Sequence, residues 1–99
     1  PSVILISSGD DAPNLRASSN RLDVRGKRVE EVDADLIPFL DKTYFSGLQE
    51  LEIIHGKGTG ALRVYIRERL KLDTRVESFA DASWETGGPG CTTVKFKRQ

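Results

Sequence analysis

The chain has 99 residues, of which 37% are hydrophobic and 30% charged, a composition typical of one small globular domain with a modest core. Lysine plus arginine and aspartate plus glutamate number 15 each, so the formal net charge is zero. Free-standing nucleic-acid-binding proteins are usually basic. Any contact with nucleic acid must therefore use a local basic patch or depend on another part of a larger protein.

Simple features of the sequence narrow the class of protein further. Cys91 is the only cysteine, which excludes an internal disulfide and favours a reducing compartment, so we expect a cytoplasmic location. The sequence has no apolar run of about 18 residues and no signal-peptide pattern, so we expect no membrane partner. The chain starts at Pro1 and contains no methionine, from which we expect a fragment of a longer polypeptide.

The first 20 residues are expected to lie outside the globular domain. Residues 3–6 are apolar and β-branched and predict at most a short strand. Residues 7–20 are rich in serine, aspartate, asparagine, glycine and proline, which is typical of a linker or a disordered segment. We therefore place the domain at residues 21–99.

The domain begins with a strand and a helix. Residues 21–26 alternate between polar and apolar, the period of a half-buried strand, which puts Asp23 and Arg25 on the same face. From residue 27 to about residue 44 apolar side chains recur with helical spacing, which predicts an amphipathic helix. Pro38 falls inside this pattern, so we expect a kink there, or a helix that ends early and restarts.

Four further elements complete the predicted fold. They are a buried strand at 50–55, a helix at 60–71, a strand at 76–82 and a final strand at 92–97 that runs antiparallel to the one before it, after a glycine-rich turn at 84–90. The order is β-α-β-α-β-β, in which βαβ crossovers join strands that run parallel and the final hairpin adds an edge. We predict a two-layer α/β sandwich, with two helices on one face of a four-stranded mixed sheet.

A glycine-rich loop between the second strand and the second helix is the strongest chemical signal. Its three glycines at alternate positions leave backbone N–H groups open to close approach, and one lysine adds positive charge. The helix that follows adds unpaired N–H groups and the positive end of its dipole. This combination predicts a phosphate-binding site. The candidate phosphate-binding residues are Gly56, Lys57, Gly58, Thr59, Gly60 and Arg63.

The loop does not match the patterns that bind free nucleotides. It fits neither the G-x-x-x-x-G-K-[ST] motif nor G-x-G-x-x-G, so we expect no nucleotide to bind to this domain. The sequence also lacks a compact cluster of histidine, cysteine and carboxylate residues, so we assign no metal site.

Two strand ends bring a possible catalytic set together. If the first two strands are parallel neighbours, Asp23 and Arg25 emerge at the same edge as His55 and Lys57. Histidine exchanges protons near neutral pH, and arginine and lysine neutralise phosphate oxygens. Aspartate can orient the histidine or hold a divalent cation such as Mg or Mn. The candidate catalytic residues are Asp23, Arg25 and His55.

Each of these residues also has a simpler explanation. His55, the only histidine, can be a structural residue at a strand end, and Asp23 with Arg25 can be an ordinary surface ion pair of little energetic value. The glycines can form a tight turn that binds no ligand. Trp84 can stack on a nucleobase or cover the rim of the core. Cys91 is expected to be a small packed residue and not a nucleophile.

Several stretches of the sequence, in order and at ordinary spacing, resemble the Smr (small MutS-related) domain. The resemblance covers about residues 21–97 and is closest to the version at the C-terminus of the bacterial MutS paralogue that suppresses recombination. Stand-alone and eukaryotic members more often have histidine where Arg25 stands. The stretches that carry the resemblance are Leu22–Gly26 (LDVRG), Arg28–Glu31 (RVEE), Ile54–Arg63 (IHGKGTGALR) and Gly87–Val94 (GGPGCTTV).

The resemblance implies a small α/β sandwich like the C-terminal domain of the third bacterial translation initiation factor. It also implies nucleic-acid binding, with nicking of DNA or cleavage of RNA by several members and a link to the rescue of stalled, collided ribosomes. We expect an endonuclease domain that nicks branched or distorted DNA within a larger MutS-like protein. The alternative is a non-catalytic module that contacts nucleic acid or the ribosome. The implied functional positions are Asp23, Arg25, His55, Gly56, Lys57 and Gly58.

Overall fold

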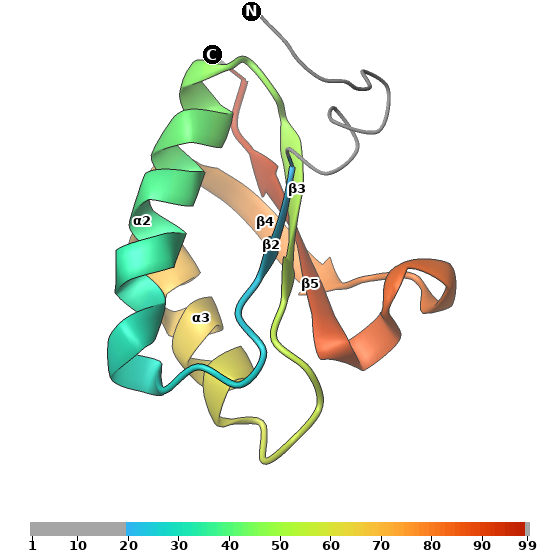
Figure 1. The fold of residues 1–99 in the computed structure, drawn as a ribbon. Helices are drawn as coiled ribbons and strands as arrows, with labels where there is room; N and C mark the ends of the chain where they lie inside the picture. The colour runs from blue at the N-terminus through green and yellow to red at the C-terminus, as the bar shows by residue number, and fades with distance from the viewer. Residues whose placement is uncertain (1–19, 99) are drawn as a thin grey trace, which may run out of the picture.

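The computed structural model describes residues 20–98, which form a sheet with two helices packed on one face (Figure 1). The strand expected at residues 3–6 and the linker after it lie outside the described residues. No helix in the described part of the chain is long and apolar enough to cross a bilayer. The elements are β2 (Arg21–Asp23), α2 (Val29–Phe45), β3 (Glu50–Ile54), α3 (Ala61–Leu72), β4 (Val76–Asp81), the 3-10 helices η1 (Trp84–Thr86) and η2 (Gly88–Gly90), and β5 (Cys91–Phe96).

The sheet is mixed, as the sequence predicts, with the strand order β2-β3-β5-β4. β2 and β3 are parallel, and β5 pairs in the antiparallel direction with both β3 and β4. The final hairpin thus joins the sheet through β5, and β4 forms the edge. An inner place suits β5 because four of its six side chains are buried, whereas β4 is mostly exposed.

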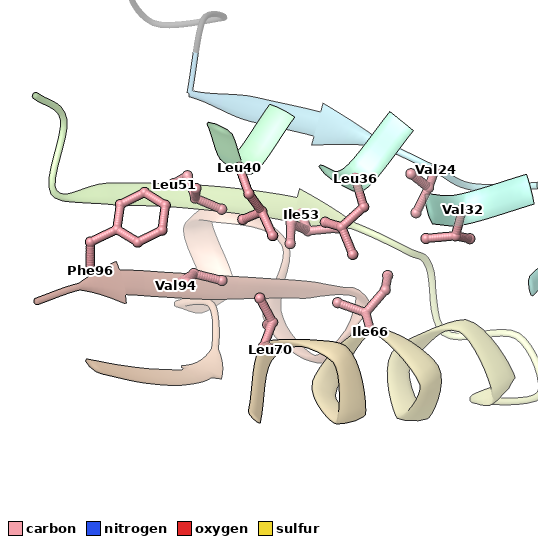
Figure 2. Packing of buried hydrophobic residues seen from close by; sticks show 10 residues of the cluster. All are labelled: Val24, Val32, Leu36, Leu40, Leu51, Ile53, Ile66, Leu70, Val94 and Phe96. Atoms are coloured by element: carbon pink, nitrogen blue, oxygen red, sulfur yellow. The ribbon is translucent and has the colours of Figure 1, made fainter. Parts of the chain in front are cut away.

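The core lies between the sheet and the helices. Figure 2 shows side chains from β3 and β5 meeting those of α2 and α3, with Val24 closing the end beside β2. Full burial of a valine, leucine, isoleucine or phenylalanine side chain stabilises the fold by about 1.5–3 kcal/mol. The residues drawn are Val24, Val32, Leu36, Leu40, Leu51, Ile53, Ile66, Leu70, Val94 and Phe96.

Pro38 does not divide α2, so the prediction that the helix ends early and restarts is wrong. α2 is one helix of 17 residues with Pro38 inside it. Proline removes the hydrogen bond to the carbonyl of Ala34, but both residues are exposed, where water can bond that carbonyl. The buried side chains of Leu36 and Leu40 hold the helix on the sheet on either side of the proline.

The first strand is shorter than the sequence predicts. β2 ends at Asp23, after which the Val24 N–H still donates to the carbonyl of Ile54 at 2.8 Å. Arg25 and Gly26 then form a turn that leads to α2. The carboxyl ends of β2 and β3 lie side by side, since Asp23 is in register with Ile54. The predicted meeting of the two strand ends is therefore confirmed, and it positions the site.

Candidate functional site

Arg25 and the glycine-rich loop meet at the carboxyl ends of β2 and β3. Gly56 has a φ of 77°, a conformation that residues with a side chain rarely adopt. A Cβ added there would lie 3.4 Å from Cγ of Arg25, so the arginine stem packs directly over the glycine backbone. The turn after β2 and the loop after β3 thus form one continuous surface.

Asp23 and Arg25 form a surface ion pair beside this loop. The Nε and Nη2 groups of Arg25 donate to Oδ1 and Oδ2 of Asp23 at 3.0 and 2.7 Å, and the Arg25 backbone N–H adds a bond of 3.0 Å to Oδ1. These bonds to Arg25 lower the pKa of Asp23, so its carboxylate stays ionised. Both side chains are open to solvent, at 45% and 63% exposure, and a ligand can reach them.

His55 is buried and held at both ring nitrogens. Only 5% of the residue is exposed. Nδ1 lies 2.8 Å from the carbonyl oxygen of Gly56, and Nε2 lies 2.8 Å from Oγ1 of Thr92. A carbonyl only accepts, so in the neutral ring Nδ1–H donates to Gly56 and Nε2 accepts from the Thr92 hydroxyl. Burial lowers the pKa of His55, and Arg67 and Arg63 lower it further, so the ring is neutral at pH 7.

The partners of His55 differ from those expected. The hypothesis that Asp23 orients the ring is wrong in this structure, because Gly56 and Thr92 do so and the Asp23 carboxylate bonds to Arg25. The ring instead joins the start of the loop to β5 through its bonds to Gly56 and Thr92. The simpler explanation of this histidine, as a structural residue at a strand end, describes the geometry well.

A second layer of polar residues supports His55 and was missed in the sequence. Nη2 of Arg67 lies 3.3 Å from Oγ1 of Thr92 and 2.6 Å from Oδ1 of Asp81. Arg63, one helical turn before Arg67 on α3, donates to the same Asp81 oxygen at 2.9 Å. The arginine spacing is visible in the sequence, but the partners on β4 and β5 depend on the tertiary fold. Arg63, predicted to bind phosphate, is thus paired with a carboxylate.

Two hollows flank the loop, and all six predicted phosphate-binding residues line the first of them. One, of about 390 Å³, is lined by residues 26–29 and 55–63, and so lies beside the first turns of both α2 and α3. The other, of about 330 Å³, is lined by Arg21, Arg25, Ile54, Gly56, Lys57, Thr86, Gly87, Gly90 and Cys91. Only Gly56 and Lys57 border both hollows. Gly58, Thr59, Gly60 and Arg63 belong to the first, and Asp23 lines neither.

Lys57 is the least constrained cation of the site. Within residues 20–98 no carboxylate lies within ion-pair distance of its Nζ, unlike Arg25 and Arg63. Its Nζ lies 5.9 Å from the centroid of the Trp84 ring. Since Lys57 borders both hollows, its ammonium group is available to a phosphate on either side of the loop.

The glycine-rich turn before β5 is fixed to the loop. The carbonyl of Gly90 accepts bonds from the backbone N–H groups of His55 at 3.1 Å and Gly56 at 2.9 Å. Trp84 in this turn is 80% exposed, so the hypothesis that it covers the core is wrong. Cys91 is buried, which confirms that it is a packed residue, and burial raises the pKa of its thiol, which disfavours the thiolate form.

The residues of the site fit a divalent cation poorly. No group of three or more histidine, cysteine, aspartate or glutamate residues suited to a metal exists within the described residues. Asp23 is the carboxylate beside the loop, and both its oxygens are bonded to Arg25. A cation at Asp23 would have to displace that arginine and take its other ligands from the substrate. We therefore derive no chemical step through a metal.

Comparison with known proteins identifies relatives of the chain. The family model described as Smr domain matches residues 22–97. A protein named Endonuclease MutS2 from Gemmatimonas aurantiaca is 51% identical over 75 residues, which are 76% of this chain and 9% of that protein. A namesake from Streptococcus suis is 39% identical over 85% of this chain and 11% of its own length. The chain thus spans about a tenth of the curated relatives it matches.

Two solved structures have the same fold. The Smr domain of Thermus thermophilus MutS2 superposes with a TM-score of 0.75 at 46% identity, over 79% of this chain and 98% of the other. YdaL, a stand-alone small MutS-related protein from Escherichia coli, gives a TM-score of 0.77 at 26% identity, over 82% of this chain and 66% of YdaL. Sequence and structure therefore agree on the same relatives.

Proposed function

The chain belongs to the Smr domain family, and on that premise we propose that it is the nucleic-acid-binding endonuclease domain of a MutS2-like protein. In this proposal it nicks branched or distorted DNA by hydrolysing a phosphodiester bond. The observation that carries the proposal is that Arg25 and Lys57 line one hollow with the Gly56 backbone, at the carboxyl ends of two parallel strands. The names of the MutS2 relatives support the same class of reaction.

Binding of the scissile phosphate is assigned to the exposed cations. Arg25 presents a planar guanidinium suited to two phosphate oxygens, and Lys57 adds a mobile point charge. The net charge of the chain is zero, so this local patch has to provide the attraction. We expect the affinity of the domain alone to be modest and to fall steeply with salt.

The chemical step is assigned to groups that a substrate can reach. A phosphate that draws Arg25 away releases the Asp23 carboxylate, and the pKa of Asp23 then rises towards its ordinary value. Asp23 can then take a proton from a water molecule whose oxygen forms the new bond to phosphorus. The bond between phosphorus and the leaving oxygen breaks, the leaving oxygen takes a proton from solvent while Asp23 returns its own to solvent, and Arg25 and Lys57 stabilise the charge that develops. Mg or Mn, if required, would supply further charge stabilisation.

His55 has a different part in this proposal. Its Nε2 lone pair is occupied by the Thr92 hydroxyl, so it accepts a proton from substrate or water only after Thr92 has moved. We assign His55 as the residue that holds the loop in shape. Proton transfer by His55, the role expected from the sequence, would require that rearrangement.

Nicking of a supercoiled plasmid tests the proposal. Asp23→Ala, Arg25→Ala and His55→Ala are compared with wild type and with Lys71→Ala, which removes an exposed cation at the far end of α3. We expect the first three variants to lose nicking activity and the Lys71→Ala control to keep it. If all three nick like wild type, the assigned site is wrong. Repeating the wild-type assay with EDTA tests the need for a divalent cation.

A non-catalytic binding module is the second candidate. The observation that favours it is the burial of His55 with both ring nitrogens bonded, which leaves no nitrogen of the ring open to a substrate. In that case the domain would bind DNA or ribosomal RNA on behalf of a larger protein. Binding without cleavage of any branched DNA or structured RNA, at stoichiometric protein, would support this candidate. Robust nicking would exclude it.

A further inference from the structure

We propose that Trp84 forms a stacking site for one unpaired nucleobase beside the phosphate-binding loop. The site would take a base from a single-stranded segment, a flap or a gap whose backbone is held by Arg25 and Lys57. The inference rests on the proposed nucleic-acid binding and extends it, because it specifies that the substrate has an unstacked base near the bound phosphate.

The indole ring is exposed but held in place. Trp84 is 80% exposed, although most tryptophans are largely buried. A Cβ added at Gly88 would lie 3.1 Å from Cε3 of the ring, so the ring rests against the Gly88 backbone. The N–H groups of Thr86 and Gly88 both donate to the carbonyl of Ser83, at 3.0 and 2.9 Å. This hydrogen-bonded turn fixes the backbone that carries the ring, which lowers the entropy lost on stacking.

The ring has a fixed relation to the phosphate-binding loop. Gly90, in the same turn, accepts two backbone bonds from the loop, and a Cβ there would lie 3.6 Å from the Gly56 backbone and 3.7 Å from Cγ of Lys57. Nζ of Lys57 lies 5.9 Å from the ring centroid. Figure 1 shows the turn (orange, between β4 and β5) projecting from the sheet, away from α2 and α3. The turn that carries the ring therefore stands clear of the helical layer, and the ring lies close to the Lys57 ammonium group.

The charges around the ring favour a nucleotide over an apolar partner. The adjoining hollow is lined by Arg21, Arg25 and Lys57 and by no carboxylate. An aromatic face next to cations is the combination that binds single-stranded nucleic acid, in which bases stack and phosphates are neutralised. A base inside a duplex is covered by its neighbours and presents no face. The ring therefore selects for an unpaired base.

Tryptophan fluorescence provides a direct test, because Trp84 is the only tryptophan in the chain. The 99-residue chain is titrated with a single-stranded oligothymidylate of 12 nucleotides, and its fluorescence is followed together with the anisotropy of a label on the DNA. Stacking predicts quenching that saturates with the same affinity as the anisotropy change. Binding without quenching would overturn the proposal.

Variants separate stacking from charge. We expect Trp84→Ala to bind the single strand about tenfold more weakly, Trp84→Phe to keep part of the affinity, and duplex binding to change less than about twofold. Phe45→Ala is the matched control, because Phe45 is 79% exposed and lies at the C-terminal end of α2, away from the loop. Circular dichroism checks that each variant is folded.

Salt dependence identifies which contact each variant removes. Trp84→Ala should leave the slope of log affinity against log salt unchanged, whereas Lys57→Ala should reduce it by about 0.7, the value for one phosphate contact on a single strand. Wild-type affinity in a folded Trp84→Ala would overturn the stacking site and leave the proposed function intact. If wild type binds neither single strand nor duplex, the proposed function fails together with the stacking site.

Discussion

The two sides of the loop at residues 55–60 differ in how their side chains are held. On the inner side, His55, Thr92 and Arg67 are joined by hydrogen bonds, and His55 and Thr92 are almost fully buried. On the outer side, Arg25 and Lys57 are exposed; Arg25 has a solvent-open ion pair, and Lys57 has none within residues 20–98. We call these the inner cluster and the outer cluster.

The comparison teaches that the most chemically suggestive residue need not be the one that meets the ligand. His55 is the only histidine, but its ring is occupied by the protein itself. The outer cluster has weaker bonds to the protein, and a phosphate can replace them at small cost, because exposed ion pairs contribute about 0–1 kcal/mol. We infer that the inner cluster sets the shape of the loop and that the outer cluster binds.

The largest expected effect comes from removing the centre of the inner cluster. His55→Ala leaves the Thr92 hydroxyl and the Gly56 carbonyl without their partner and opens a cavity, so we expect the free energy of unfolding to fall by about 2–4 kcal/mol. Lys57→Ala, in the outer cluster, should change it by less than about 0.5 kcal/mol. Urea unfolding of both variants measures their free energies of unfolding. Equal values would show that the inner cluster does not stabilise the fold more than the outer cluster does.

A smaller effect is expected from the hydroxyl that holds the ring. Thr92→Val keeps the shape of the side chain but leaves Nε2 of His55 without a donor, at a cost of about 1–3 kcal/mol. Thr93→Val is the matched control on the same strand, and the half-buried Thr93 side chain has no hydrogen bond to any of residues 20–98. Urea unfolding again gives the measurement. If the two valine variants are equally stable, the Thr92 bond does not hold His55.

Much of the fold could be predicted from the sequence because its signals are local. Alternating and helical periods locate the elements to within about two residues, except for the first strand, which ends three residues early, and the glycines mark the loop and the turn. The burial of Val94 and Phe96 on one face of β5 follows from the same alternation. The expected early end of the helix at Pro38 is wrong because the cost of a proline depends on whether water can reach the freed carbonyl, and both Pro38 and Ala34 are exposed.

The site was less predictable because its decisive contacts join residues that are distant in the chain. The pairing of Asp23 with Arg25 joins residues only two positions apart, at the turn that follows β2, so it could be predicted locally. The bonds that bury His55 cross 37 residues to Thr92, and the pairing of Arg67 with Asp81 needs the packing of α3 beside β4. The predicted phosphate-binding residues are close in sequence and do line one hollow, but the second hollow joins Gly56 and Lys57 to Arg25 and to the turn before β5, which are distant in the chain.

The pH dependence of stability sharpens the same comparison. Burial lowers the pKa of His55 below its ordinary value of about 6.5, so below that pH the unfolded chain binds a proton that the folded chain does not. The contribution of His55 to the free energy of unfolding should therefore be complete above about pH 6.5. It should fall as the pH is lowered, with a slope of at most about 1.4 kcal/mol per pH unit.

Two measurements check this expectation. Since His55 is the only histidine, a single imidazole resonance in proton NMR should titrate below pH 6.5. His55→Asn should remove most of the stability change between pH 7 and pH 5. A resonance that titrates at or above pH 6.5 would mean that the ring is accessible to protons, and it would return His55 to the list of residues that exchange protons with a substrate.

The smallest expected effect tests whether Asp81 keeps Arg63 and Arg67 from binding a phosphate. Asp81 accepts bonds from both Arg63 and Arg67, so Asp81→Asn weakens a competitor for their charge. We expect duplex DNA to bind about two- to fivefold more tightly, with a steeper dependence on salt. Glu77→Gln, on the same strand, removes the same charge without touching those arginines and should change the affinity less. Equal gains in the two variants would assign the effect to net charge, and Arg63 would then have no part in binding the phosphate.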